Sequence, residues 1–561
     1  MYPSMHIANS VKEEKTMENS KLKRAVALAL SVVMVFCLFV TANPTSLMAA
    51  GAAQENDTST TDEALEILGD DKWSKYKAKY AHIPNYQGEA ITVNADAADL
   101  SKGGEKVDYL GKQNVVLMSD TGSVSWTINV PETGLYAIDI VYSYFGSDDT
   151  RAKAADIERT LRINGEVPYT ELRNLVFTKK WVDILDEDMV KRDELGNIID
   201  IEYDKDSADN ERRPVKELKP EWTNYTVCDP TGNYNGEFYF YLEKGENVIT
   251  LQSQKEYMLV DTIAIREREF LQSYDEYLAY YDALDYKSVS EDVAFKLEAE
   301  FYTATSSSTI YGQNDRSSAI TSPQHPSYTW INDVGGRNGS YNWASVGQWI
   351  EWEFTVPETG YYTISTRFLQ DAVEGLFVSR RLYINGEVPF EEANNLQFLY
   401  DDSWQGAKLG DGDEEFKFAF EAGKTYTIKL EVNYGNLGEI VAELRDCVTR
   451  VNAIYIKILA ISGSSPDPYM DYTYYKRIPD EIAEMGQLAK RLYAVSEEMK
   501  EISGGESSSS TAAVENVARV LEKMAADSER QIAKNFSQLK SYIGNLGTWI
   551  NNIGQQALIV D

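Results

Sequence analysis

Hydrophobic and polar residues alternate along several short stretches of the chain. Two of these stretches cover residues 124–130 and 350–356, and their apolar positions are Val124, Trp126, Ile128 and Val130 in the first and Ile350, Trp352, Phe354 and Val356 in the second. A period of two with one apolar face is typical of a β-strand that is buried on one side. The pattern therefore predicts half-buried strands in these stretches.

The strands belong to an internal repeat. Residues 130–168 contain VPETGLYAIDIVYS followed by LRINGEVPY, and residues 356–390 contain VPETGYYTISTRFL followed by LYINGEVPF. Pro-Glu-Thr-Gly predicts a turn, a second alternating strand follows it in each copy, and Asn-Gly predicts a β-hairpin. Two copies of one β-rich unit therefore follow each other in the chain.

The end of each copy extends the pattern. Residues 238–252 and 416–432 each predict two strands around a glycine turn, and VDTIAI at 260–265 and VNAIYI at 451–456 each predict a closing strand. Short strands separated by turns predict a mainly β fold of two tandem β-sandwiches, at 88–268 and 292–462. The first copy carries an insertion at 182–230, whose acidic stretch DIEYDKDSADNERRP predicts a solvated surface excursion.

The hydrophobic period changes outside the two copies. We expect a linker at 51–87 with a short helix near 59–82, a helical connector at 269–291, and a linker at 463–477. From 478 to 553 apolar residues recur every three or four positions, which predicts a helical hairpin or a three-helix unit. The segment 478–561 ends in ALIVD, which either docks back as an edge strand or marks a reading frame that once continued.

The N-terminus has the pattern of an export signal. A basic cluster at Lys21, Lys23 and Arg24 precedes the apolar run 25–42, and small residues near position 50 fit a cleavage site. We expect residues 1–50 to be a signal peptide and the protein to be extracellular or at the cell surface. The alternative is an uncleaved membrane anchor, because 18 apolar residues just reach the membrane-spanning range.

Composition excludes several classes of function. The formal net charge is −35, with 54 Lys and Arg against 89 Asp and Glu, so nucleic acid is not expected as a partner. The three histidines and three cysteines are too few and too dispersed for a His-based catalytic centre or a disulfide framework. No spacing among the acidic residues singles out a catalytic pair. We therefore predict a protein that is not an enzyme.

The repeat resembles a known family of binding modules. FKLEAEFY at 295–302, the tandem VPETG and INGEVP blocks and the expected last strand VNAIYI resemble carbohydrate-binding modules of the family 6/35 type, which are jelly-roll sandwiches with an opening Glu-Ala-Glu strand. The order of sandwich, helical connector, sandwich and helical unit also resembles the N-terminal region of large extracellular solute-binding proteins of ABC sugar importers. In those proteins a separate bilobal solute-binding domain follows.

The first resemblance implies a structural calcium ion held by acidic residues of the first and last strands. The matching positions are Glu298, Glu300 and Asn452 in the second copy, and Asn94, Asp96 and Asp261 in the first copy. All six side chains carry an oxygen, the ligand atom that calcium prefers. Ordinary polar residues of an edge strand are the alternative interpretation.

A loop of the second copy is a candidate glycan site. Extracellular sugar binding usually rests on an exposed aromatic face with polar groups beside it. Between 326 and 349 the chain combines both kinds of residue around glycines, and the first copy has no such aromatics. The rings that we predict to contact a sugar are Trp330, Trp343, Tyr328 and Tyr341, and the polar contacts are Asn338 and Asn342.

Two functions of different classes follow from these features. The first is a secreted, non-catalytic protein that captures a polysaccharide or oligosaccharide for an ABC-type uptake system, with a permease or a separate solute-binding domain as partner. The second is a structural or adhesive surface protein whose sandwiches bind other proteins or the cell wall. A further alternative is the accessory part of a polysaccharide-degrading enzyme encoded on another chain.

Overall fold

The fold was taken from a computed structural model that describes residues 72–290, 292–318, 321–336, 341–502 and 509–561. All of these belong to one compact unit, Leu68–Asp561. The predicted signal peptide and residues 59–71 of the predicted helix at 59–82 lie outside the described residues; within the remainder of that range the structure has α3, Trp73–Tyr80. Within the described ranges, no helix is long and apolar enough to cross a membrane.

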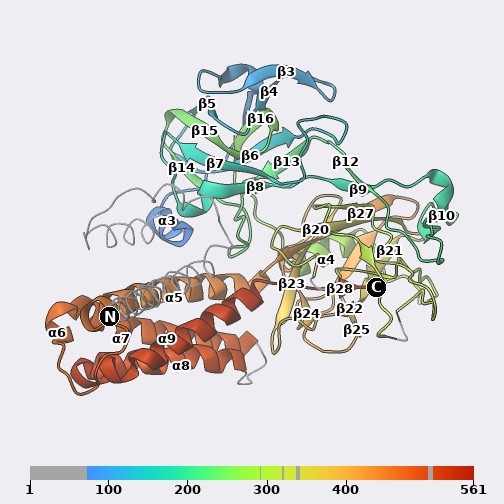
Figure 1. Cartoon of the computed structure of the whole chain (residues 1–561). Coiled ribbons are helices and arrows are strands. Elements are labelled where there is room, and N and C mark those ends of the chain that lie inside the picture. The colour runs from blue at the N-terminus through green and yellow to red at the C-terminus, as the bar shows by residue number, and fades with distance from the viewer. Residues whose placement is uncertain (1–71, 291, 319–320, 337–340, 503–508) are drawn as a thin grey trace, which may run out of the picture. The chain divides into compact units, whose positions relative to one another are not determined.

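The first copy is a β-sandwich, as predicted (Figure 1). One of its sheets has the order β2-β5-β15-β7-β8, and the other has the order β13-β6-β16-β4-β3 with β1 beside β16 and β14 beside β6. The strands are β1 Ile91–Asn94, β2 Ala98–Asp99, β3 Glu105–Tyr109, β4 Lys112–Met118, β5 Ser123–Val130, β6 Gly134–Ser143, β7 Ile157–Ile163, β8 Leu175–Phe177, β13 Thr223–Thr226, β14 Phe240–Leu242, β15 Gly245–Lys255 and β16 Met258–Arg266.

The alternation of buried and exposed residues along the strands explains how the two sheets pack together. On β5 the residues Val124, Trp126, Ile128 and Val130 are all buried, whereas Thr127 and Asn129 between them are exposed. The buried side chains of both sheets form one core. The predicted Asn-Gly hairpin turns are also confirmed, because Asn164 and Gly165 have φ of 52° and 89° and their counterparts Asn385 and Gly386 have 52° and 88°. Positive φ at both central residues is the requirement of a type I′ turn.

The acidic stretch of the insertion 182–230 is largely exposed, as predicted, but the insertion as a whole is more than a surface excursion. It contains β10 Val190–Arg192 paired with β11 Ile198–Ile201, and it contains β12 Lys216–Leu218, which pairs with β9 Trp181–Asp183. Trp181 of β9 in turn pairs with Thr305 of the second copy. Ile201 and Tyr203 are buried with Phe301 and Ile331 of the second copy. The apolar residues among the acidic ones therefore attach the insertion to the second sandwich.

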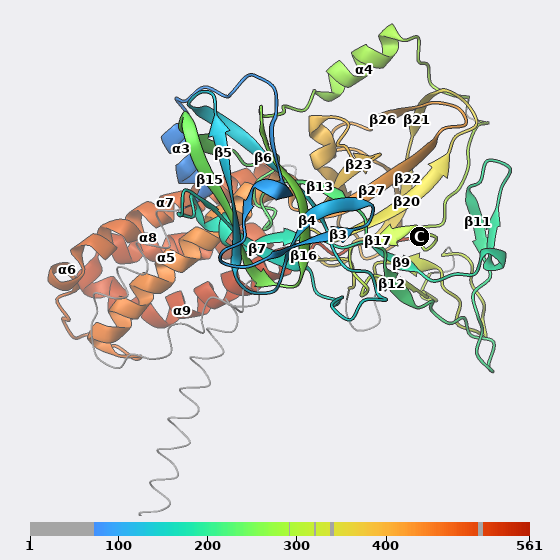
Figure 2. The same ribbon diagram turned by 90° about the horizontal axis from the view of Figure 1, so that it is seen from above.

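The second copy repeats the sandwich with altered edges (Figure 2). Its sheets have the orders β12-β9-β17-β20-β27-β23-β24, β18-β19-β28-β22-β25 and β21-β26. The predicted connector is α4, Tyr274–Ala283, which a Ser273–Glu276 capping box begins. The strands are β17 Ala304–Thr305, β18 Gly312–Gln313, β19 Asp333–Val334, β20 Trp349–Thr355, β21 Gly360–Thr363, β22 Ser365–Leu369, β23 Phe377–Ile384, β24 Leu396–Leu399, β25 Gln405–Lys408, β26 Lys417–Phe420, β27 Thr425–Asn433 and β28 Ile559–Val560.

Short 3₁₀ turns complete the two sandwiches. They are η1 Ala95–Ala97, η2 Thr170–Asn174, η3 Glu187–Met189, η4 Glu391–Asn394 and η5 Gly435–Leu437. The opening strand expected at 295–302 does not form, because residues 293–298 have no regular structure and Ala299–Glu300 form a turn. Its counterpart β1 in the first copy does form and pairs with β16.

The closing strand predicted at 451–456 is wrong, because VNAIYI lies in a long helix. The helical unit starts earlier than predicted and consists of α5 Gly438–Ser462, α6 Tyr474–Arg477, α7 Pro479–Ile502, α8 Ser509–Ala526 and α9 Ser528–Ile553. On α5 the residues Val451, Ile454 and Ile458 are buried, a spacing of three and four that belongs to a helix face. Helices α5, α7, α8 and α9 lie side by side as a bundle (Figure 1).

The real closing strand of the second sandwich is β28, at the end of the sequence. Val260 of β16 pairs with Tyr142, and Val560 of β28 pairs with Phe368, which the repeat aligns with Tyr142. The segments KEYMLVD at 255–261 and QQALIVD at 555–561 are therefore equivalent. The helical bundle is thus inserted into the second sandwich between its last two strands, and ALIVD docks back as the sequence analysis allowed.

Candidate functional site

Three carboxylates meet at the edge of the second sandwich. Glu298, Glu300 and Asp561 have ligand atoms that all lie within 4.8 Å of one another. Glu300 is 2% exposed, and neither of its carboxylate oxygens has a hydrogen-bond partner among the described residues. Two cations lie at the rim, because Lys296 Nζ is 2.7 Å from Glu298 Oε2 and Arg367 Nη1 is 2.9 Å from Asp561 Oδ2. Glu300 itself is left without either of them.

The cluster is electrostatically unfavourable in its ionised form. Burial raises the pKa of Glu300 well above its usual range, and the carboxylates of Glu298, Asp561 and Asp333 raise it further. Burial also raises the pKa of Asp561 to about 6, although Arg367 opposes this change. Buried carboxylate oxygens without protein donors are the ligand set that a hard divalent cation requires. The residues present therefore fit a calcium ion.

The predicted metal residues divide into three groups. Glu298 and Glu300 come together as predicted. Asn452, the residue predicted from the last strand, is on α5, and Asp561 of β28 lies beside the two glutamates instead. In the first copy, Asp96 Oδ1 is 3.0 Å from Lys106 Nζ, and Asp261 Oδ2 is 2.5 Å from Lys112 Nζ. Asn94 is on β1, opposite Thr262. Lysines thus neutralise the acidic positions of the first copy.

The predicted aromatic site does not form as one surface. Trp343 is fully buried in the core, where the Arg380 guanidinium lies 4.1 Å from the ring, so its ring has no face for a sugar and its assignment is wrong. Tyr341 donates to Asp371 Oδ1 at 2.5 Å. Asn342 Nδ2 donates to the Tyr311 carbonyl at 3.2 Å. Asn338 lies outside the described residues.

Tyr328 and Trp330 both lie beside His325, and Trp330 is also approached by the insertion. The ring of Tyr328 is stacked on His325 at 4.3 Å, and His325 also lies 5.1 Å from the ring of Trp330. Lys205 of the insertion places Nζ 4.9 Å from the Trp330 ring. Both rings remain partly exposed. The two rings are therefore grouped around His325, and the insertion approaches the ring of Trp330.

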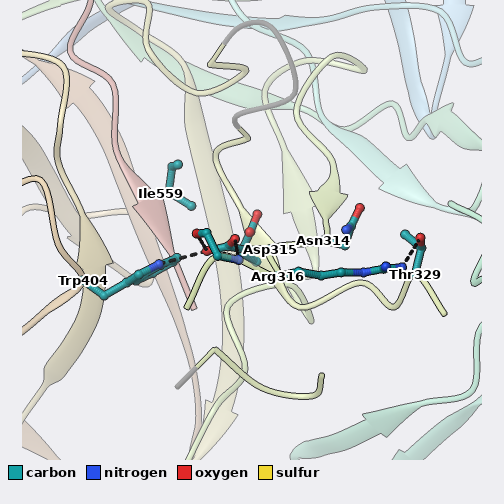
Figure 3. Close-up of a pocket in the computed structure, with 8 residues that line it drawn as sticks. Asn314, Asp315, Arg316, Thr329, Trp404 and Ile559 are labelled. Carbon is teal, nitrogen blue, oxygen red and sulfur yellow. Dashed lines mark hydrogen bonds between the residues drawn. The ribbon is translucent and has the colours of Figure 1, made fainter. Parts of the chain in front are cut away.

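A polar cavity with a tryptophan in its wall lies beside the carboxylate cluster. Its volume is about 420 Å³, and it is lined by Asp333 and Ser317 together with the six residues labelled in Figure 3, which are Asn314, Asp315, Arg316, Thr329, Trp404 and Ile559. Trp404 Nε1 donates to Asp315 Oδ2 at 3.0 Å, and Arg316 Nη2 donates to Thr329 Oγ1 at 2.8 Å. One aromatic side chain surrounded by fixed polar groups is the composition of a small-ligand site.

Trp404 also connects this cavity to the carboxylates. The guanidinium of Arg367 lies 5.1 Å from the Trp404 ring and forms the ion pair with Asp561. Ile559, the residue two before Asp561, lines the cavity. The last strand of the sandwich therefore contributes to the cavity and to the carboxylate cluster at the same time.

Trp404 was not predicted as a site residue, although the repeat contains a signal for it. Thr223 pairs with Tyr142 and Gln405 with Phe368, so Trp222 and Trp404 occupy equivalent positions just before β13 and β25. In the first copy Trp222 donates from Nε1 to the Leu110 carbonyl at 3.1 Å, and Lys112 Nζ lies 4.7 Å from its ring. Aligning EWT at 221–223 with SWQ at 403–405 would have identified the pair.

The helical bundle matches a known family. Residues 439–553 match the family model described as bacterial solute-binding protein, 4-helix bundle domain. A search of curated proteins finds no match to the chain. The matched range lies within α5 to α9 and thus within the segment inserted between β27 and β28.

Among solved structures, the chain is similar to several carbohydrate-binding modules. A family 35 module from Clostridium thermocellum is 14% identical, with 32% of this chain and 99% of that chain covered and a TM-score of 0.19. A family 35 module from Paenibacillus barcinonensis is 11% identical, with coverages of 31% and 97% and a TM-score of 0.17. The C-terminal family 6 module of LamC, a laminarinase from Zobellia galactanivorans, is 14% identical, with coverages of 32% and 100% and a TM-score of 0.17. The chain thus contains, at 439–553, a segment similar to the 4-helix bundle domain of bacterial solute-binding proteins.

Proposed function

We propose that this protein is a non-catalytic glycan-binding component of an ABC-type sugar uptake system, and that its second sandwich holds the glycan. The observation that carries the proposal is the cavity in which Trp404 is surrounded by Asp315, Arg316 and Asn314. The ring offers a sugar an apolar face, and the side chains around it offer hydrogen bonds to hydroxyl groups. In the first sandwich the equivalent Trp222 binds the Leu110 carbonyl and lies under Lys112, and this sandwich serves as a supporting module.

Calcium is part of this proposal. Glu298, Glu300 and Asp561 would hold the ion, which would supply positive charge next to Glu300, the member of the cluster that has no cation partner among the described residues. Because Asp561 is ion-paired with Arg367, and Arg367 lies over Trp404, a bound ion would also fix the wall of the glycan cavity. The first sandwich, with Lys106 and Lys112 at its acidic positions, would not need the ion.

The helical bundle supports the assignment to an uptake system. Its match to the 4-helix bundle domain of bacterial solute-binding proteins favours a role beside a permease or a separate solute-binding domain. Such a role requires export, which agrees with the basic cluster and apolar run near the N-terminus. In this arrangement the protein would lie outside the cell and concentrate a polysaccharide or oligosaccharide near the transporter.

The proposal is tested by titrating the whole chain with a panel of neutral and acidic oligosaccharides in a calorimeter, in the presence of calcium. Stacking of one ring on one sugar contributes about 1–3 kcal/mol by analogy with stacking on nucleobases. We expect dissociation constants in the micromolar to millimolar range. Trp404→Ala should abolish measurable binding.

Trp222→Ala is the matched control, because it removes the equivalent ring from the first sandwich. It should leave glycan binding unchanged. Equal loss of binding in the two variants would place the function of the rings in folding and contradict the proposed site. If the wild-type protein bound no glycan of the panel, and bound a wall polymer or a surface protein instead, the adhesive function would replace the proposal.

A further inference from the structure

The glycan cavity continues into a second, larger cavity. The second cavity has a volume of about 930 Å³ and shares Asn314 and Thr329 with the first. Its other walls come from both copies, with Arg212, Arg213 and Lys216 on the insertion of the first copy and Tyr311 on the second copy. Because they share two wall residues, the two cavities adjoin, and we refer to the surface from Trp404 to the insertion as the groove.

The wall contributed by the insertion is held firmly against the second sandwich. Glu211 N donates to the Thr329 carbonyl at 2.8 Å, and Thr329 N donates to Asn210 Oδ1 at 2.8 Å. Ile331 N donates to Glu211 Oε2 at 2.8 Å. The carboxylate of Glu211 is thereby engaged by the loop of the second copy. These bonds fix residues 210–213 at the edge of the groove.

Three arginines of this groove have no ion pair between described residues. Arg212, Arg213 and Arg316 line the groove, and none of the three takes part in an ion pair between described residues. The groove lysine, Lys216, differs, since its Nζ is 2.8 Å from Asp183 Oδ1. In a chain with 89 acidic and 54 basic residues, arginines have many carboxylates to pair with. The three arginines are exposed beside the cavity walls and are therefore available to bind a negatively charged ligand.

Local contacts hold the guanidinium groups of two of these arginines in place. The Arg213 guanidinium lies 3.9 Å from the centre of the Tyr311 ring, an arrangement that fixes the plane of the group and leaves its N–H donors at the edge free to bind. Arg316 uses Nη2 to bind Thr329, and the rest of its guanidinium fork remains available. Guanidinium forks match the geometry of carboxylate and sulfate oxygens better than that of single hydroxyl groups.

We propose that the groove binds an extended acidic glycan, an oligosaccharide bearing carboxylate or sulfate groups, with one sugar at Trp404 and the acidic groups of further sugars at Arg316 and Arg213. The inference rests on the proposed glycan site at Trp404. It adds the chemical class of the ligand and a site assembled from both copies. The insertion of the first copy then serves to lengthen the binding groove of the second copy.

The test compares three oligosaccharides of four to six sugars with the whole chain: an oligogalacturonate, a sulfated galactan oligosaccharide and a neutral galactan oligosaccharide. The variant Arg213→Gln/Arg316→Gln should bind the acidic ligand about ten- to a hundredfold more weakly, because each lost bond is charge-assisted. Affinity of the wild type for that ligand should fall between 50 and 200 mM NaCl more steeply than affinity of the variant. The two acidic ligands decide between carboxylate and sulfate.

Control variants separate this inference from the function on which it rests. Arg192→Gln removes an exposed arginine on the β10–β11 hairpin and should change nothing. Arg213→Lys/Arg316→Lys should recover part of the affinity. Glycan binding that depends on Trp404 but is equal for neutral and acidic ligands, or unaffected by the double variant, would overturn the acidic-groove inference and leave the glycan site standing. Binding that is unaffected by Trp404→Ala would overturn the proposed function itself.

Discussion

Both sandwiches have the same three kinds of residue at the closing strand, but the surroundings of these residues differ. In the first sandwich Lys112 lies over Trp222 and pairs with Asp261; in the second, Arg367 lies over Trp404 and pairs with Asp561. Each group thus consists of a tryptophan, a cation and the aspartate of the last strand. The tryptophan is packed under a hairpin in the first copy and lines a cavity in the second.

The length of one hairpin accounts for much of this difference. In the first copy the strands β3 and β4 are joined at Leu110 and Gly111, whose positive φ values of 46° and 78° make a tight turn. The equivalent strands of the second copy, β18 and β19, are separated by residues 314–332. The tight hairpin supplies Lys112 and the carbonyl that binds Trp222. The long loop supplies Asn314, Asp315 and Arg316 to the cavity instead.

The same difference decides how the acidic residues are neutralised. Lys106 pairs with Val116 on β4, and by the same register Gly312 pairs with Val334 on β19, so Gly312 occupies the position of Lys106. Asp96 of the first copy therefore has a lysine, and Glu300 of the second has none. A repeat whose strands are nearly identical can thus carry a self-contained ion pair in one copy and a cation site in the other.

The largest expected effect comes from removing the strand that follows the bundle. Deletion of Ala557–Asp561 from a protein tagged at its N-terminus should cost the second sandwich on the order of 5–9 kcal/mol, because Leu558, Ile559 and Val560 are each at most 2% exposed. Calorimetry should show the loss of one unfolding transition, while the transition of the first sandwich remains.

Single substitutions at equivalent core positions provide the control. Leu558 and Met258 are both fully buried, so Leu558→Ala and Met258→Ala should each cost about 2–5 kcal/mol in their own sandwich. If Leu558→Ala destabilised only the helical bundle, β28 would not belong energetically to the second sandwich.

The buried arginines offer the next test. Arg380 donates to the Gln556 carbonyl at 2.8 Å, as Arg159 donates to the Lys255 and Glu256 carbonyls at 2.7 and 2.9 Å, just before the closing strand of each copy. Burial lowers the pKa of Arg380 far below its usual range and that of Arg159 to about 10. Arg380→Met should cost about 3 kcal/mol, mostly because buried carbonyls lose a charged donor.

Hydrogen exchange distinguishes the roles of the two buried arginines, Arg380 and Arg159. Arg380→Met should speed exchange at β28 and at the end of α9, and Arg159→Met should speed it only in the first sandwich. Unchanged exchange at β28 would show that packing alone holds the returning strand.

Calcium and pH should act on the second sandwich only. Because the pKa of Glu300 and that of Asp561 are raised on folding, their contribution to the stability of the metal-free protein is fully present below about pH 4. That contribution is lost as the pH rises through about 6, the pKa of Asp561, and further toward that of Glu300. Calcium at a hundred times its dissociation constant should restore about 2.7 kcal/mol at pH 7.5 and much less at pH 5.

Thermal melting in calcium and in chelator at both pH values measures this effect. Glu300→Gln should remove both the calcium shift and most of the pH slope, whereas Asp96→Asn, at the matching position of the first copy, should alter neither. A calcium shift that survives Glu300→Gln would place the ion elsewhere.

The smallest effect is expected for the ion pair of the first copy. Lys112 and Asp261 are 35% and 24% exposed, so Lys112→Met should cost about 0.5–1 kcal/mol at low salt and less at high salt. It should not create calcium binding, because Lys106 still neutralises Asp96. A calcium-dependent rise in melting temperature of the Lys112→Met first sandwich would mean that the two copies have equivalent acidic sites.

Local patterns in the sequence predicted the strands around the VPETG and INGEVP blocks of both copies and the late helices correctly. The period of two in β5 and β20 and the Asn-Gly turns depend only on neighbouring residues. The error at 451–456 arose because VNAIYI is apolar enough for a strand and for a helix face. Trp343 was misjudged for a related reason, since a ring in a glycine-rich stretch is exposed or buried according to what packs on it.

The sequence by itself determined that the chain contains two related sandwiches, an acidic surface and amphipathic helices, because repeats, charge and periodicity are local properties. Only the tertiary structure decided that β28 closes the second sandwich after the bundle, that Asp561 rather than Asn452 joins Glu298 and Glu300, and that Trp404 lines the cavity. These partners are separated by up to about half of the chain. Their proximity results from strand pairing and core packing, which no window of neighbouring residues contains.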